Sequence, residues 1–295
     1  MSPTTMDFTT KFVRSKNPCA QGYRWFVRNH QEGGDYQQVL DALVEAGRID
    51  DACWLLNQFG PTDAVLKLDA VEAEALVFAG SIEVRGGIEV NSLVRAGRSI
   101  RAGGGIRAGR TIIAGEDIQA GAAIRSSDTL ESGGDILCEM SIETLGAIRC
   151  GGGLRALWDV TCGGKFDAVD KVLVGQDLVV EGAIACGKDL HVRGAITGSD
   201  SIHARQGILC GASLRCALHL EAGLGIKATD SIIAGGSIRA GESLSAGHEL
   251  RAGPGYGVFA GLCVQHEAWE ASAMVSASVR PERLMSGCWA GACLV

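Results

Sequence analysis

Large aliphatic residues recur at every sixth position of the chain from Ile82 to Leu262. The 31 positions of this series hold Ile, Leu or Val, except for Phe166 and Tyr256. The residue two places after each of them is Ala, Val, Cys, Ser, Thr or Gly. A six-residue period does not match the 3.6-residue turn of an α-helix, so the pattern excludes a long amphipathic helix.

The spacing within each repeat predicts a short β-strand followed by a turn. Residues i and i+2 of a strand point to the same side, so we expect Ile100 and Ala102 to face inward and Arg101 outward. Gly103 then provides a corner where a side chain would crowd the backbone or where φ must be positive. Three such sides close one coil of 18 residues, and stacked coils pair their strands in parallel.

We therefore predict a mostly β fold, a right-handed triangular parallel β-solenoid of about ten coils of 18 residues, over residues 76–264. Residues 1–75 are predicted to form a small α-helical N-terminal domain or cap, with helices over 17–30, 35–46 and 49–59. Asp35 is the expected N-cap of the second helix and Gly47 ends it. Residues 265–295 are expected to form a C-terminal capping segment, because an uncovered solenoid end exposes strand edges and core.

Two resemblances extend this prediction. The order of large and then small residues, with GDILC at Gly134–Cys138 and GEDIQA at Gly115–Ala120, resembles bactofilins. This resemblance implies a right-handed β-helix and a structural scaffold that self-assembles. The helical segment that contains CAQGYRWF and VLDALVEAGRIDDACWLLNQFGP resembles modules of bacterial toxin-immunity neighbourhoods, which implies toxin neutralisation.

The cysteines and the absence of targeting signals predict a protein of the bacterial cytoplasm, where disulfides are rare. The chain has eleven cysteines but no signal peptide and no apolar run of about 18 residues, so we expect reduced thiols and no membrane association. Six cysteines occupy the small inward position and are expected to be apolar fillers, namely Cys138, Cys150, Cys162, Cys186, Cys210 and Cys216. CWAGAC at Cys288–Cys293 lacks the second pair of ligands that a metal site needs.

The net charge of −7 is concentrated near the N-terminus. Residues 32–74 contain ten acidic residues against Arg48 and Lys67. No basic stripe is present, which argues against direct nucleic-acid binding. The acidic segment is either a solvated helical face or the binding surface for a basic protein partner such as a toxin domain. Its candidate partner-binding residues are Asp35, Asp41, Glu45, Asp50 and Asp51.

No set of residues typical of catalysis stands out. His191 and His203 lie at outward positions, but the series has no inserted loop that would build a cleft beside them. Gly-x-Gly patterns are explained by the corners, since no helix follows them as in a phosphate-binding loop. We therefore predict a non-enzymatic protein without catalytic residues, cofactor or metal. A hexapeptide-repeat acyltransferase-type enzyme is the alternative that clefts beside these histidines would favour.

Outward apolar residues are the other candidate for a binding surface. Leu137, Leu173 and Leu209 lie on one side, two coils apart, and Val179 and Ile113 are expected to be exposed on other sides. Such residues are either scattered surface positions or a stripe that binds a partner or forms a homodimer. The function predicted from the sequence is protein binding, most concretely by an immunity protein that neutralises a bacterial toxin. A bactofilin-like scaffold is the alternative.

Overall fold

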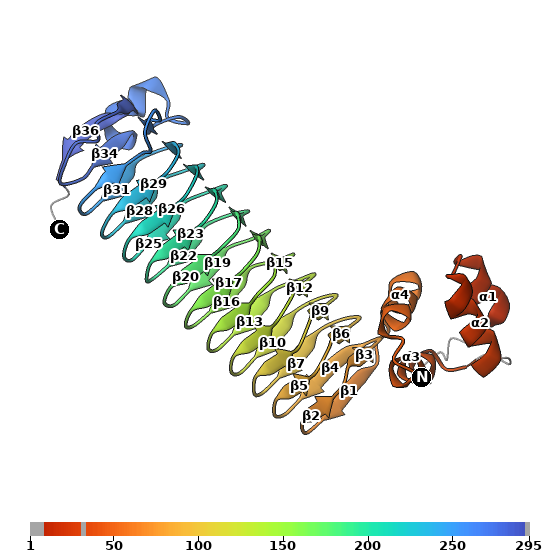
Figure 1. The fold of residues 1–295 in the computed structure, drawn as a ribbon. Helices are drawn as coiled ribbons and strands as arrows, with labels where there is room; N and C mark the ends of the chain where they lie inside the picture. The colour runs from red at the N-terminus through yellow and green to blue at the C-terminus, as the bar shows by residue number, and fades with distance from the viewer. Residues whose placement is uncertain (1–8, 31–33, 293–295) are drawn as a thin grey trace.

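The structure is a computed structural model that describes residues 9–30 and 34–292. A small helical region leads into a long right-handed parallel β-solenoid of about 13 turns (Figure 1). Strands stack in register every 18 residues, so that Ile118 lies between Ile100 and Ile136. The predicted fold class is confirmed, but the solenoid has about 13 turns where ten coils were predicted, because its strands begin at Val65, within the predicted helical domain, and continue to Gly291, within the predicted capping segment.

Three parallel sheets form the sides of the solenoid and contain 13, 11 and 12 strands. Sheet A consists of β1 (Val65–Leu68), β4 (Ser81–Val84), β7 (Ile100–Ala102), β10 (Ile118–Ala120), β13 (Ile136–Cys138), β16 (Leu154–Ala156), β19 (Val172–Val174), β22 (Leu190–Val192), β25 (Ile208–Cys210), β28 (Ile226–Ala228), β31 (Leu244–Ala246), β34 (Met274–Ser276) and β36 (Cys288–Gly291). Sheet B consists of β2 (Val71–Ala73), β5 (Ile88–Val90), β8 (Ile106–Ala108), β11 (Ile124–Ser126), β14 (Ile142–Thr144), β17 (Val160–Cys162), β20 (Leu178–Val180), β23 (Ile196–Gly198), β26 (Leu214–Cys216), β29 (Ile232–Ala234) and β32 (Leu250–Arg251). Sheet C consists of β3 (Leu76–Phe78), β6 (Val94–Ala96), β9 (Ile112–Ala114), β12 (Leu130–Ser132), β15 (Ile148–Cys150), β18 (Phe166–Ala168), β21 (Ile184–Cys186), β24 (Ile202–Ala204), β27 (Leu220–Ala222), β30 (Ile238–Ala240), β33 (Val258–Phe259) and β35 (Leu284–Ser286).

The six-residue series lines the core as predicted, with one correction at its end. Every large residue of the series from Ile82 to Leu250 is at most 2% exposed. Tyr256 and Leu262 were expected to continue the series, but both are exposed. Val258 takes the next core place instead and pairs with Ile238, twenty residues earlier. A turn that contains Pro254 and a positive-φ Gly255 adds two residues here, and it interrupts the period.

The corner glycines are required by close packing of successive coils. A Cβ on Gly187 would overlap the backbone carbonyl oxygen of Val169 in the preceding coil. Positive φ is not the reason, since the positive-φ glycines among the described residues are all outside the regular corners. Of the two reasons expected from the sequence, crowding is therefore the one that applies.

Aspartates that precede the core residue connect neighbouring coils. The Asp117 carboxylate accepts a hydrogen bond of 2.9 Å from the Asp135 backbone N–H, and Asp135 in turn accepts one of 2.7 Å from Gly153. Asp177 accepts from the Ala195 N–H in the same way. These bonds give a physical reason for the Gly-Asp-Ile pattern, because the carboxylate pairs with a backbone donor at the corner of the next coil.

The helical region contains α1 (Thr10–Ser15), α2 (Ala20–Asn29), α3 (Tyr36–Glu45) and α4 (Ile49–Phe59). The last three agree with the predicted helices, and Asp35 caps α3 by accepting from the N–H groups of Gln37 and Gln38 at 3.0 and 3.3 Å. Gly47 has the positive φ of a helix C-terminus. The short α1 was not predicted, although Thr9 caps it.

The helices pack against the first strands of sheet C, and Gln37 completes their backbone hydrogen bonding. Its side-chain amide donates to the Val77 C=O at 3.0 Å and accepts from the Ala79 N–H at 2.9 Å, so it pairs with the edge strand β3. Val77 and Ala79 belong to the helical core cluster, and Ile113 packs against this cluster. The expected exposure of Ile113 was therefore wrong, because the helices cover it.

The two ends of the solenoid are covered to different degrees. At the N-terminal end, the helices contact β3, whereas β1 and β2 form the free edges of sheets A and B. Val65 and Leu68 of β1 are exposed as a result. At the other end, β34 and β36 extend sheet A, and β33 and β35 extend sheet C. The helices η1 (His266–Ala268) and α5 (Trp269–Ser272) lie within this terminal segment (Figure 1).

Candidate protein-binding surfaces

The five predicted acidic residues lie on the helical region but do not form one uniform surface. Asp35 is engaged as the cap of α3, and Asp51 forms an ion pair with Arg48. Asp41, Glu45 and Asp50 are exposed. Asp41 accepts a hydrogen bond of 2.7 Å from Gln37, the residue that contacts β3, so it also helps to orient that side chain.

Asp41 and Glu45 lie one helical turn apart on α3 and therefore share a face. Loss of solvent around the Asp41 carboxyl raises its pKa, and the Gln37 hydrogen bond partly opposes this effect. The charges of Glu45 and Asp35 add to the upward shift of the pKa. These acids are thus close enough to interact, as a small acidic cluster requires.

The three predicted leucines occupy one row on the outside of sheet A. Leu137 and Leu209 are exposed and Leu173 is half-buried. The register places Arg155 between the first two leucines of the row and His191 between the last two. The row therefore alternates leucines with Arg155 and His191, which agrees with scattered surface positions, the first of the two possibilities left open by the sequence, and not with a continuous stripe.

A wider apolar surface surrounds the central coils. Within residues 69–136, which the structure describes completely, no large hydrophobic side chain is exposed. Six are exposed within the next 43 residues, and we refer to them as the central apolar belt: Leu137, Leu145, Leu157, Trp158, Val169 and Val179. Sequence reasoning identified Leu137 and Val179 but missed the four corner residues, which do not follow the inward–outward alternation of the strands.

Trp158 is the most distinctive member of the belt. It lies at the corner between β16 and β17 with 47% of its surface exposed, next to the equally exposed Leu157. Its backbone is fixed by neighbouring coils, since its N–H donates to Met140 and its C=O accepts from Gln176. The corner therefore presents a large apolar ring on a rigid backbone, which is typical of protein-binding hot spots.

The preceding coils carry charged rows instead. Arg101 pairs with Glu83, and Arg107 with Glu89, across adjacent strands at 3.9 and 3.5 Å. Exposed pairs of this kind contribute little to stability. They nevertheless keep this part of the solenoid polar, so the apolar surface begins abruptly at the central coils.

The six core cysteines are buried as predicted, and their thiols also form hydrogen bonds. The Sγ atom of Cys150 lies 3.3 Å from the Gly134 carbonyl oxygen and 3.2 Å from that of Gly153. The thiols of Cys138 and Cys186 also contact two corner carbonyl oxygens each, one in the preceding coil and one in their own coil. Thr144 donates to a corner carbonyl at an equivalent position. The small inward position therefore accommodates a donor as well as an apolar filler.

Burial raises the pKa of all six core thiols, and it raises the pKa of Cys216 to about 11 from a reference of 9.0. The folded state therefore favours the protonated thiol. This stabilising contribution is complete below pH 9 and is lost as the pH rises from about 9 towards 11. We expect urea unfolding to show a lower free energy of unfolding at pH 10 than at pH 7.5.

The Cys216→Ala variant isolates this contribution from other alkaline effects. It should lose less stability than the wild-type protein between the two pH values, because one of the buried thiols is gone. An equal loss of stability in the two proteins would show that ionisation of Cys216 does not destabilise the folded state.

The residues considered for catalysis or metal binding lie on different parts of the solenoid. His191 lines a shallow groove of about 350 Å³ on sheet A together with Leu209 and Lys227. His203 lies on sheet C between Ala185 and Glu221. Among the described residues, no group of three or more His, Cys, Asp or Glu side chains could hold a metal ion. Cys293 of the CWAGAC segment lies outside the described residues.

Comparison with known proteins identifies only the helical region. The family described as the YdhT N-terminal domain matches residues 6–59, which include α1 to α4. No curated protein and no solved structure matches the chain. In the part of the chain that the structure describes, no helix has both the length and the apolar character needed to cross a membrane.

Proposed function

We propose that the protein is a non-enzymatic protein-binding protein whose solenoid presents the central apolar belt to a partner. The observation that carries this proposal is the exposed Trp158–Leu157 corner on a rigid backbone. Large aromatic side chains at the centre of an interface contribute a disproportionate share of binding energy. Leu157 and Trp158 are adjacent at one corner, and adjacent exposed apolar residues mark an interaction site more often than isolated ones do.

The solenoid suits this role because its surface is preorganised. Trp158 is held by backbone hydrogen bonds to the coils on both sides, and Leu145, Leu157 and Val169 each donate their backbone N–H to the preceding coil. Binding then orders few additional groups, which lowers the entropic cost of association. The charged rows that precede the belt keep the apolar contact away from the N-terminal coils.

The more specific form of the proposal is an immunity protein that neutralises a bacterial toxin in the cytoplasm. The exposed Asp41, Glu45 and Asp50 carboxylates on the helical region would attract a basic toxin domain. The belt would supply the apolar part of the same interface or a second contact. The match of residues 6–59 to the YdhT N-terminal domain supports a separate helical module at this end of the chain.

The proposal is tested with the products of genes adjacent to the gene for this protein. We expect one of them to copurify with the wild-type protein, and Trp158→Ala to raise the Kd at least about tenfold, because the variant removes the largest exposed ring. Leu262→Ala is the matched control, since Leu262 is about as exposed but lies outside the belt. Equal weakening by both variants, or no effect of Trp158→Ala, would contradict binding through the belt.

A bactofilin-like scaffold is the second candidate, and the free edges of β1 and β2 favour it. These strands leave the N-terminal ends of sheets A and B open, with Val65 and Leu68 exposed. Unpaired edges promote association of chains through added strands. Electron microscopy of the purified protein decides between the candidates, because long filaments without any partner would support the scaffold and count against the immunity protein.

A further inference from the structure

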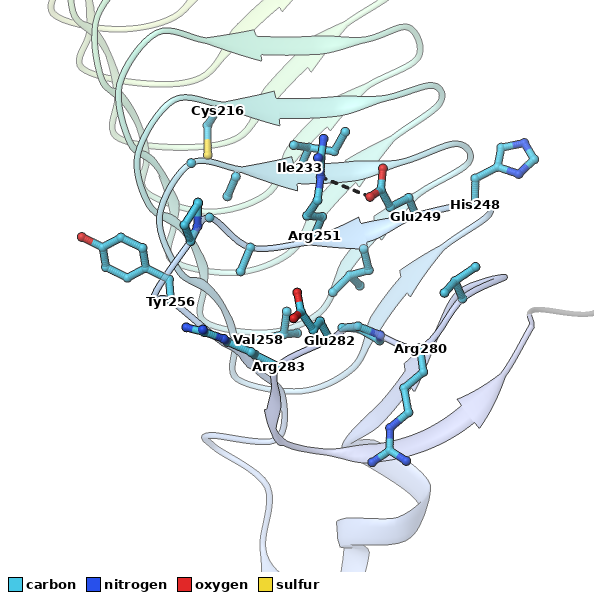
Figure 2. A pocket seen from close by; sticks show the side chains of 18 of the residues that line it. Cys216, Ile233, His248, Glu249, Arg251, Tyr256, Val258, Arg280, Glu282 and Arg283 are labelled. Atoms are coloured by element: carbon cyan, nitrogen blue, oxygen red, sulfur yellow. Dashed lines mark ion pairs between the residues drawn. The ribbon is translucent and has the colours of Figure 1, made fainter.

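Sheet B ends one coil earlier than the other two sheets at the C-terminal end of the solenoid. Beyond β32, sheet A continues with β34 and β36, and sheet C continues with β35 after β33. The segment 277–283 connects these sheets and crosses the side where the next strand of sheet B would lie. Figure 2 shows this segment on the far side of a groove from β32, with the Glu282 side chain directed toward β32, the Arg283 side chain directed to one side and the Arg280 side chain directed away.

The groove leaves backbone groups of β32 without their usual partners. In the regular coils of sheet B, the N–H of the large core residue donates to the following coil, as Ile232 does to Glu249 at 2.8 Å. The C=O of the small core residue accepts from the following coil, as Cys216 does from Gly235. Among the described residues, neither the Leu250 N–H nor the Ala252 C=O has such a partner.

The segment 277–283 does not supply these partners. It is fixed at its two ends, where the Ser278 N–H donates to the His248 C=O and the Arg283 C=O accepts from the Val258 N–H. Pro281 between them has no N–H to donate. The groove between this segment and β32 has a volume of about 1010 Å³, at the upper end of the range of ligand pockets.

The charge of the groove is opposite to that of the whole protein. Three arginines and two glutamates line it, although the chain has a net charge of −7. Arg251 is paired with Glu249 at 3.1 Å. Arg280 and Arg283 form no ion pair with any described residue, so both are available to an acidic ligand.

We propose that β32 binds an extended acidic segment of a partner protein, which adds to sheet B as a parallel strand. Such strand addition uses backbone hydrogen bonds for affinity and alternate side chains for specificity. The inward side chains of the segment would be apolar and continue the row that ends at Leu250. The outward side chains would be acidic and lie near Arg251 and Arg283, and Arg280 would approach them only by a change of its side-chain rotamer. The groove is separate from the central apolar belt, so this proposal and the proposed function can fail independently.

The regular coils define which edge of the added strand must face β32. In each coil, the N–H of the inward core residue points to the following coil, as in Ile232. The N–H of the corner residue three places later points to the preceding coil, as in Gly235. Because backbone direction alternates along a strand, the outward residues of the added segment would donate their N–H groups to β32. The inward residues would direct theirs away from it.

Fluorescently labelled synthetic peptides with alternating Val and Glu over seven residues test the proposal against the full-length protein. We expect saturable binding by fluorescence polarisation, with N-methylation of the Glu residues abolishing it and N-methylation of the Val residues changing the Kd less than threefold. The corresponding Val–Lys peptide should not bind. The Arg280→Ala, Arg283→Ala double variant should raise the Kd at least tenfold.

The matched control is the Arg155→Ala, Arg239→Ala double variant, which removes two exposed arginines of sheets A and C that have no ion pair among the described residues. It should leave the Kd unchanged, and circular dichroism should show that both double variants are folded. Binding of the Val–Lys peptide, equal weakening by the two double variants, or equal effects of the two N-methylated peptides would overturn the proposal. So would absence of saturable binding, including the case in which a second copy of the chain occupies the groove.

Discussion

Replacing Ile118 by Asp should destabilise the protein by more than about 4 kcal/mol and disrupt the coils around β10. Ile118 is completely buried and lies between Ile100 and Ile136 in the stacked row of sheet A. The substitution removes a large apolar side chain and places a carboxyl group where its neighbours are hydrocarbon. Far-ultraviolet circular dichroism and urea unfolding measure the loss.

The adjacent Gln119 provides a matched control, because it is on the same strand but faces solvent. Gln119→Asp should change the free energy of unfolding by less than about 0.5 kcal/mol. In a repeat array each coil contacts only its neighbours, so the Ile118→Asp protein should also unfold over a broader range of urea concentration. Equal stability of the two variants would contradict the inward orientation of Ile118 and, with it, the solenoid core.

Phe166→Ala should cost about 3–5 kcal/mol in the free energy of unfolding. Phe166 is the one aromatic residue in the regular core series from Ile82 to Leu250, and it is completely buried in β18. It stacks between Ile148 and Ile184. Truncation removes the ring and leaves a cavity that the hydrogen-bonded coils on either side can close only in part.

Phe166→Leu tests whether the cost comes from the cavity. It restores a branched aliphatic side chain, the kind found at every other position of the series from Ile82 to Leu250, and should cost less than about 1.5 kcal/mol. Urea unfolding of the two variants at neutral pH gives the comparison. If Phe166→Leu destabilised the protein as much as Phe166→Ala, the aromatic ring itself would be needed at this position, and the cavity explanation would be wrong.

The two proposed binding sites make different demands on a partner. The belt around Trp158 offers apolar area on a rigid surface, whereas β32 offers an open strand edge beside Arg280 and Arg283. A partner with a folded apolar surface would use the first, and one with an extended acidic segment the second. The Trp158→Ala variant and the Arg280→Ala, Arg283→Ala variant therefore separate the two contacts experimentally.

The sequence by itself determined the solenoid and the direction of most of its side chains. A strand alternates with a period of two, and each side of the coil takes six residues, so the position of Ile118 in the series was sufficient to place it in the core. The helices at 36–45 and 49–59 followed in the same way from local apolar spacing and from the capping residue Asp35.

Only the tertiary structure decided features that depend on residues far apart in the chain. The helices cover Ile113, Gln37 completes the edge of β3, and the turn at Pro254 and Gly255 removes Tyr256 from the core. The exposure of the corner residues in the belt and the open edge of β32 also depend on residues far apart in the chain. Each results from packing between coils or between regions, and the six-residue period contains no information about which neighbour a corner or a strand edge will meet.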